Sequence, residues 1–241
     1  MRTPSFWSFI KNDKYCVGCT GQTVYVYSAD GTELAKFKDL KYAYTAAFSP
    51  KGDIFVVKSA EGRLAIYSLS NLSLIKKFRF SKIDASQDDS FCFSPDGELF
   101  LNIERHKQDY ISVLSIYSTA DFSLVGRYFE EDDTLVPNTI EYGIKTGEYY
   151  ILGYERPENI EYLSELRHFI ARFSDGILCD KFYITEKEEE FYYWYKECEA
   201  GGFTQKRLQW TPLANRGYNV EKLKSQKLSL EGLWTYYNEK E

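Results

Sequence analysis

Histidines and cysteines are the residues of this 241-residue chain with the most versatile chemistry, and both are scarce. The two histidines, His106 and His168, are far apart in the sequence, and neither belongs to an H-E-x-x-H metal motif. A G-x-S-x-G nucleophile motif and a glycine-rich phosphate loop are also missing. We therefore predict that the protein is not an enzyme and needs no cofactor.

Cys16 and Cys19 form the sequence C-V-G-C, a spacing found in zinc and redox sites. No second C-x-x-C pair or histidine pair supplies the other ligands that a structural zinc ion needs. On a β-strand, residues three apart point to opposite faces, so these two thiols would not meet at one metal ion. We therefore predict buried thiols and no metal site.

Cysteine usage and overall charge suggest a compartment and a class of partner. The five cysteines are an odd number spread along the chain, which favours reduced thiols over a disulfide framework. The first residues lack the apolar core of a signal peptide, and no apolar run is long enough to span a membrane. We expect a cytoplasmic protein without membrane contact. The formal charge of −6 disfavours nucleic-acid binding, which uses a basic surface, so the expected partner is a protein.

An internal repeat indicates which elements would position any binding residues. The sequence F-S-P-K-G at 48–52 recurs as F-S-P-D-G at 93–97, 45 residues later. Each copy is followed by a short apolar strand, a polar loop, a strand ending in I-Y-S, a turn and a last strand. Two consecutive units therefore have the same four predicted strands in the same order.

The same pattern continues in both directions. Upstream, V-Y-V-Y-S is followed by the hairpin turn A-D-G, and downstream H-F-I-A-R-F is followed by the turn S-D-G. A four-stranded unit that repeats about every 40–50 residues is typical of a β-propeller blade. We predict four blades, at about residues 1–40, 41–85, 86–134 and 135–186.

In these segments the chain resembles the WD-repeat-like β-propeller family, and most closely bacterial propellers with F-S-P-D-G blades. The resemblance covers about three quarters of the chain, but the G-H and W-D dipeptides of true WD repeats are missing. It implies an all-β fold in which residues 1–241 form a single propeller domain. It says little about function, because this fold hosts many.

The C-terminal segment, residues 187–241, does not repeat clearly. Apolar residues recur at helical spacing twice, first at Phe191, Trp194, Tyr195 and Cys198, and again at Leu230, Leu233, Trp234 and Tyr237. The segment could form a degenerate fifth blade or a partly helical cap. We favour a five-unit ring that this segment closes.

Acidic residues are concentrated in particular predicted loops. In a propeller, the connections between blades share one face with the loops between the second and third strands of each blade. Gathering like charges on one face is not needed for folding, and such a face would attract a basic partner. The predicted partner-binding residues are Asp84, Asp88, Asp89, Glu130, Glu131, Asp132, Asp133, Glu155, Glu158 and Glu161.

Three functional hypotheses follow. The first is a non-catalytic propeller, a monomer by itself, that binds a basic protein through its acidic loops; its most specific form is an immunity-type inhibitor of a basic nuclease toxin. The second is a propeller that binds a small ligand or a carbohydrate in a central aromatic pocket, because the chain has 21 tyrosines and 4 tryptophans. The third is an enzyme with its site in the central channel.

Overall fold

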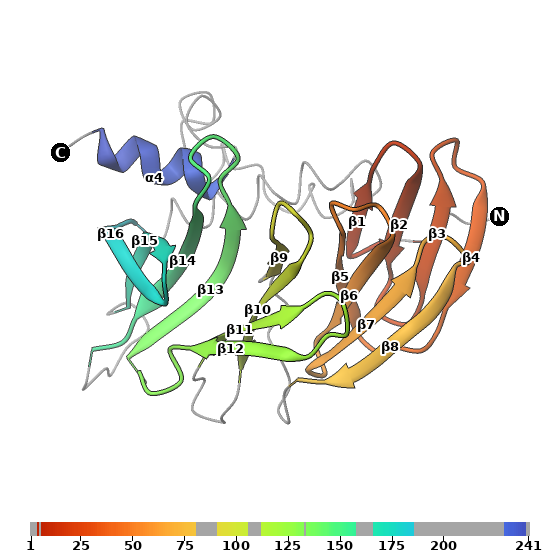
Figure 1. The fold of residues 1–241 in the computed structure, drawn as a ribbon, viewed down its shortest axis with the longest axis horizontal. Coiled ribbons are helices and arrows are strands. Elements are labelled where there is room, and N and C mark those ends of the chain that lie inside the picture. The colour runs from red at the N-terminus through yellow and green to blue at the C-terminus, as the bar shows by residue number, and fades with distance from the viewer. Residues whose placement is uncertain are drawn as a thin grey trace. The chain divides into compact units, whose positions relative to one another are not determined.

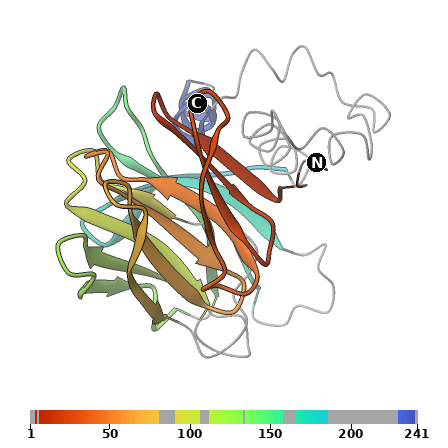
Figure 2. The same ribbon diagram turned by 90° about the vertical axis from the view of Figure 1, so that its right-hand side faces the viewer.

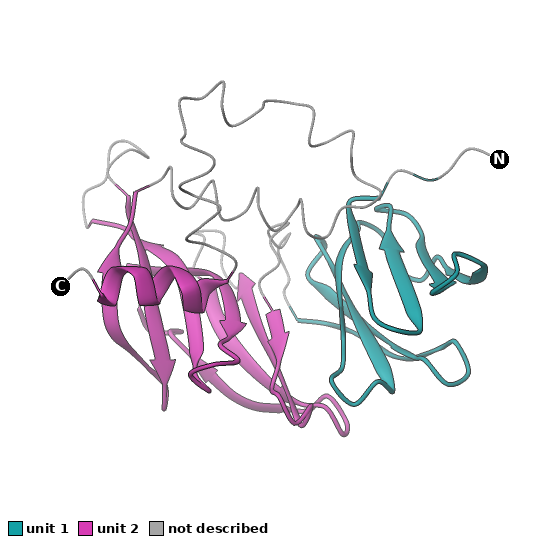
Figure 3. Cartoon of the chain, turned by 90° about the horizontal axis from the view of Figure 1, so that it is seen from above, with its two compact units in different colours: residues 1–89, 197–210 teal, residues 90–196, 211–241 magenta. Residues whose placement is uncertain are grey.

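A computed structural model describes residue 4 and residues 6–80, 91–105, 112–132, 134–157, 166–185 and 229–239. These residues form four antiparallel sheets of four strands each, together with a helix. The chain divides into two compact units, residues 1–89 with 197–210 and residues 90–196 with 211–241 (Figure 3). The all-β prediction and the four predicted four-stranded units are confirmed. Each unit is described by itself below.

Unit 1 contains two sheets whose strands follow one another in sequence order (Figure 1, Figure 2). The first sheet is formed by β1 (Ser8–Lys11), β2 (Tyr15–Cys19), β3 (Val24–Ser28) and β4 (Glu33–Phe37). The second is formed by β5 (Ala43–Phe48), β6 (Ile54–Ser59), β7 (Arg63–Ser68) and β8 (Ser73–Arg79).

Unit 2 contains the other two sheets and the helix (Figure 1). Its first sheet is formed by β9 (Phe91–Phe93), β10 (Leu99–Arg105), β11 (Ser112–Ser118) and β12 (Leu124–Tyr128). Its second is formed by β13 (Leu135–Tyr142), β14 (Tyr149–Glu155), β15 (Arg167–Ser174) and β16 (Ile177–Tyr183), and the helix is α4 (Leu230–Asn238).

The repeated F-S-P-x-G sequence forms the turn between the first and second strands of two sheets. In the first copy, the Gly52 amide donates to the Ser49 carbonyl at 2.9 Å, and Gly52 has a φ of 70°. In the second copy, Gly97 makes the same 2.9 Å bond to Ser94 and has a φ of 68°. Glycine adopts this left-handed conformation without steric cost, which explains its place in both turns.

The fourth strand of three sheets carries a β-bulge at an equivalent position. The pairing shifts by one residue next to the last tyrosine of the third strand, at Tyr27, Tyr67 and Tyr117. The extra residues, all exposed, are Leu34, Ile75 and Val125. A bulge twists an edge strand and protects it from pairing with another chain. These edges are therefore poor sites for adding a strand.

The core of unit 1 lies between its two sheets. Val17 and Val26 from the first sheet pack with Phe55 and Tyr67 from the second, and all four side chains are fully buried. The rings of Phe55 and Tyr67 stack with their centroids 4.9 Å apart. Alternate residues of each strand point into this layer, as expected for strands with two different faces.

Unit 2 has apolar layers on both faces of the β13–β16 sheet. Ile151 and Phe169 pack against β10 and β11 on one face. On the other face, Leu230 and Leu233 of α4 pack against Tyr150, with Leu152 and Ile170 in the same cluster. The helix therefore covers the face that points away from the β9–β12 sheet.

Helix α4 begins at Ser229, whose hydroxyl accepts a hydrogen bond from the Gly232 amide at 3.1 Å. This helix confirms the second predicted helical spacing, at Leu230–Tyr237. The first, at 191–198, lies outside the described residues, as does most of the predicted closing segment. In the described residues, no helix has the length and apolar character needed to cross a membrane.

Candidate partner-binding surface

Four of the ten predicted partner-binding residues belong to the described part of the chain. Glu130, Glu131 and Asp132 are exposed in the connection from β12 to β13, and Glu155 is the last residue of β14. The other six lie outside the described residues: Asp84, Asp88, Asp89, Asp133, Glu158 and Glu161.

Asp132 and Glu155 lie at the same end of the β13–β14 pair. Leu135, the first residue of β13, pairs with Glu155, and its amide donates to Asp132 Oδ1 at 3.1 Å. The Arg156 amide also donates to the Thr134 carbonyl at 2.8 Å. The structure therefore brings the β12–β13 connection to the end of β14, where the β14–β15 connection begins.

The carboxylate of Asp132 shapes its own loop. Besides the Leu135 amide, it accepts the Thr134 amide at 3.0 Å and the Thr134 hydroxyl at 2.7 Å. Aspartate often stabilises turns in this way, by accepting hydrogen bonds from the backbone that follows. Asp132 therefore holds the loop in shape, and the exposed carboxylates beside it are those of Glu130 and Glu131.

Glu155 is surrounded by positive charge from its own sheet. Its carboxylate binds Lys181 Nζ, accepts the Tyr183 hydroxyl at 2.8 Å and lies 3.8 Å from an Arg167 nitrogen. The Arg167 guanidinium lies 3.9 Å from the centre of the Tyr183 ring. Glu155 therefore brings less negative charge to this end of the sheet than the sequence suggests.

The interactions of Glu155 with Lys181, Tyr183 and Arg167 should make a pH-dependent contribution to stability. Burial alone would raise the pKa of the Glu155 carboxyl, but the Lys181 and Tyr183 hydrogen bonds and the nearby positive charges together lower it below its ordinary value. A lowered pKa stabilises the fold above the unfolded-state value, and this contribution disappears as the pH falls through the folded-state value. We expect Glu155→Gln to cost about 1 kcal/mol at pH 7.

The wild-type advantage over Glu155→Gln should shrink below about pH 4.5. Urea unfolding of both proteins between pH 3 and pH 7 measures it. A difference that stays constant across this range would contradict the assigned ion pairs.

A buried carboxylate lies on β10, close to the β12–β13 connection with its exposed Glu130 and Glu131, which we call the acidic loop. Glu104 is 1% exposed and accepts the Asn102 amide at 3.1 Å, the Ser115 hydroxyl at 2.8 Å and the Tyr117 hydroxyl. A buried charge is tolerated only where hydrogen bonds and opposite charge replace its hydration. Burial and the Glu104 carboxylate also raise the pKa of the Tyr117 hydroxyl, so it stays protonated and donates.

Arg127 connects this buried carboxylate to the acidic loop. Its Nη2 lies 3.8 Å from Glu104 Oε2, and its Nε donates to the Ser115 hydroxyl at 3.2 Å. Its Nη1 lies 3.7 Å from the Glu130 carboxylate. The sequence prediction missed Glu104, although its place two residues after Asn102 in an apolar strand was a usable signal.

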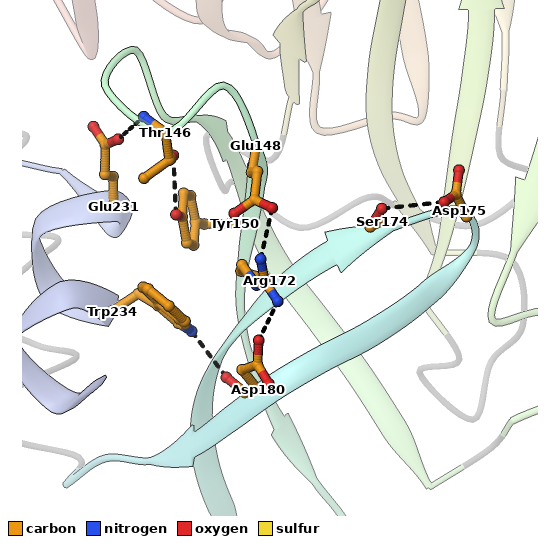
Figure 4. A network of polar contacts seen from close by, with 9 residues as sticks. All are labelled: Thr146, Glu148, Tyr150, Arg172, Ser174, Asp175, Asp180, Glu231 and Trp234. Atoms are coloured by element: carbon orange, nitrogen blue, oxygen red, sulfur yellow. Dashed lines mark hydrogen bonds and ion pairs between the residues drawn. The ribbon is translucent and has the colours of Figure 1, made fainter. Parts of the chain in front are cut away.

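A second polar network fastens α4 to the β13–β16 sheet (Figure 4). The Glu231 carboxylate accepts the backbone amides of Lys145 at 3.0 Å and Thr146 at 2.7 Å. The Trp234 indole N–H donates to the Asp180 carbonyl at 2.9 Å, and Arg172 binds the Asp180 carboxylate. The hydrogen bonds of Glu231 and Trp234 hold the helix in place.

The histidine and cysteine residues form no recognisable reactive centre in the described segments. His168 lies in β15, with its ring 6.0 Å from that of Tyr154. Cys16 and Cys19 both lie in β2 as free thiols. Cys19 is buried as predicted, whereas Cys16 is only half-buried, and this burial raises its pKa. Among the described residues, no group of three or more histidine, cysteine, aspartate or glutamate side chains could hold a metal ion.

Comparisons with known proteins give a likeness of fold. No family model matches the chain, and no curated protein matches it. The chain is similar to the solved structure of hydrazine synthase from Kuenenia stuttgartiensis, with a TM-score of 0.56 and 11% sequence identity. The match covers 67% of this chain and 48% of the other, so the chain spans about half of that protein's length. At this identity the likeness concerns the fold alone.

Proposed function

We propose that the chain is a non-catalytic protein-binding scaffold that holds a basic partner at its β12–β13 loop. One observation carries this proposal: the exposed carboxylates of Glu130 and Glu131 lie on a loop that is held on both sides. Arg127 fixes one side through the buried Glu104, and the Asp132 turn fixes the other. A loop that is already ordered loses little entropy on binding, and its negative charge speeds encounter with a basic surface.

We further propose that the four sheets act as the blades of a propeller. The shared strand order and the repeated F-S-P-x-G turn support this arrangement. The position of α4 favours a helical cap over a fifth blade. Its apolar side packs on Tyr150 and Leu152, the face of the last sheet that a following blade would need.

The most specific form of the proposal is an immunity-type inhibitor, cytoplasmic and monomeric by itself, that neutralises a basic nuclease toxin. Nucleases carry basic surfaces for the phosphate backbone, and an ordered acidic loop complements such a surface. The absence of catalytic motifs from the sequence agrees with a protein that acts by binding.

The experiment uses the full-length wild type and two double variants as bait at low salt, the loop variant and the turn variant. Glu130→Gln with Glu131→Gln removes the exposed acids of the loop. Glu98→Gln with Asp175→Asn removes two exposed acids at the β9–β10 and β15–β16 turns. Proteins retained by the wild type are identified by mass spectrometry, and their affinity is then measured at increasing salt.

We expect a basic partner whose affinity falls about ten-fold in the loop variant and stays unchanged in the turn variant. Wild-type binding should weaken with salt, and the loop variant should depend on salt less. An acidic or neutral partner, or equal losses in both variants, would contradict the proposal.

A further inference from the structure

The two units carry opposite charge. The described residues of unit 1, 6–80, contain 11 lysines and arginines against 6 aspartates and glutamates. The described residues of unit 2 contain 7 lysines and arginines against 14 aspartates and glutamates. The net charge of −6 is the sum over the whole chain, and it hides this difference between the units. Unit 1 is therefore basic, although the chain as a whole is acidic.

The cations of unit 1 gather at one end of its sheets. At this end β4 connects to β5, β6 connects to β7, and β8 finishes. In unit 2, the equivalent connection from β12 to β13 is the acidic loop. Among the residues that the structure describes, the cations exposed or half-buried at this end of unit 1 are Lys38, Lys41, Arg63, Lys77 and Arg79; Asp39 and Glu61 lie among them, with Glu61 3.9 Å from Arg63.

Hydrogen bonds hold this end of unit 1 together. Lys77 Nζ donates to the Asp39 carbonyl at 2.9 Å, and the Ser59 hydroxyl donates to the Lys41 carbonyl at 2.6 Å. Arg79 also donates to the Glu61 carbonyl, at 3.4 Å. The β4–β5 connection is thus fastened to the second sheet, and its cations lie on an ordered surface.

Aromatic side chains are exposed at the same end. Tyr42 is 61% exposed, and Trp7, which is 45% exposed, stacks on Tyr44 with ring centroids 5.5 Å apart and 22° between the planes. Gly21 and Ala43 join the two sheets here by a pair of 3.0 Å backbone hydrogen bonds. Exposed aromatic side chains and cations therefore share one end of the unit.

Tyr42 has a backbone conformation that tyrosine rarely adopts. Its φ is +53°, in the left-handed region that favours glycine, and its carbonyl accepts the Ala60 amide at 3.0 Å. The exposed side chain gains little from packing that would offset this strain. Strained backbone positions of this kind cluster at functional sites.

We propose that this end of unit 1 binds single-stranded nucleic acid. Lysine and arginine would neutralise the phosphates, while Tyr42 and Trp7 would stack on unpaired bases, a combination typical of single-strand binding surfaces. An acidic peptide would also use the cations, and competition with polyglutamate distinguishes it from a nucleic acid. The surface differs from the acidic loop of unit 2 in residues and in charge, so the two sites are tested separately.

The experiment measures fluorescence anisotropy of labelled 20-nucleotide dT and rU strands, and of a DNA duplex of the same length, with the full chain at low salt. We expect both single strands to bind more tightly than the duplex, whose base faces are hidden. Affinity should fall with salt, by about 0.7 in log K per log salt for each phosphate contacted. The ratio of the affinities for the dT and rU strands then shows whether the surface prefers single-stranded DNA or RNA.

Two sets of substitutions test the cations. Lys38→Gln, Lys41→Gln and Arg79→Gln together should lower the affinity about ten-fold or more. The matched control combines Lys11→Gln, Lys14→Gln and Lys51→Gln, three exposed lysines at the opposite end of the same sheets. The control should bind within about two-fold of the wild type, because its lysines are not at the basic end.

Tyr42→Gly separates binding from folding. Glycine adopts the observed φ freely, so the melting temperature should stay equal or rise, while loss of stacking should weaken binding about ten-fold. The proposal is overturned if the wild type binds neither single strand or binds the duplex equally well. It is also overturned if the control loses as much affinity as the triple variant, or if polyglutamate of equal charge competes as effectively as the oligonucleotide.

Discussion

Glu104→Ala is expected to lower the free energy of unfolding by about 3–5 kcal/mol, the largest effect that we predict for a single substitution. The wild-type carboxylate is the shared acceptor for the side chains of Asn102, Ser115 and Tyr117, and Arg127 balances its charge. Alanine removes that acceptor and leaves buried polar groups without it. The same change also leaves a small void at this buried position.

Guanidinium titration followed by circular dichroism measures this effect, and the melting temperature should fall by about 6–20 °C. Glu104→Gln, which keeps the volume and one acceptor oxygen, should cost less than alanine. Glu131→Ala, an exposed carboxylate of the nearby loop, is the control and should change stability by less than about 0.5 kcal/mol. A loss below about 1 kcal/mol for Glu104→Ala would show that the buried network is not needed for folding.

Leu233→Ala is expected to cost about 2–5 kcal/mol, the usual range when a buried leucine is truncated. Leu233 is fully buried where α4 covers Tyr150 and Ile170 of the last sheet. Truncation leaves a cavity under the helix and weakens the attachment that Glu231 and Trp234 reinforce.

Hydrogen exchange locates the effect of this second substitution. Protection should fall first in α4 and in β14 to β16, because those elements share the truncated layer. Asn238→Ala, at the exposed end of the same helix, should leave stability and exchange nearly unchanged. If Leu233→Ala were as mild as Asn238→Ala, α4 would not be part of the core of unit 2.

Much of the fold was predictable because its signals are local. The turn at Ser49–Gly52 needs only a glycine that tolerates positive φ and a serine carbonyl three residues earlier. Alternating apolar residues mark the strands between such turns, and the repeat shows that the units are alike. The spacing of Leu230 and Leu233 marks α4 in the same way.

The candidate site was less predictable because it depends on partners far away in the chain. Glu155 is one of three spaced acidic residues in the sequence E-R-P-E-N-I-E, yet its charge is balanced by Lys181, 26 residues later. Glu104 has one local partner, Asn102, but most of its acceptor role depends on Ser115 and Tyr117 across the β10–β11 pair. Charge counted along a chain does not show which charges neutralise one another.

The sequence by itself determined the strand order and the hairpin turns of the four described units, because these depend on residues close together in the chain. It also determined the total charge. Only the tertiary structure decided which acids stay exposed, as Glu130 and Glu131 do, and that Lys41 and Arg79 meet at one end of unit 1. Such pairings depend on strand register and sheet packing, which bring together residues that no local pattern connects.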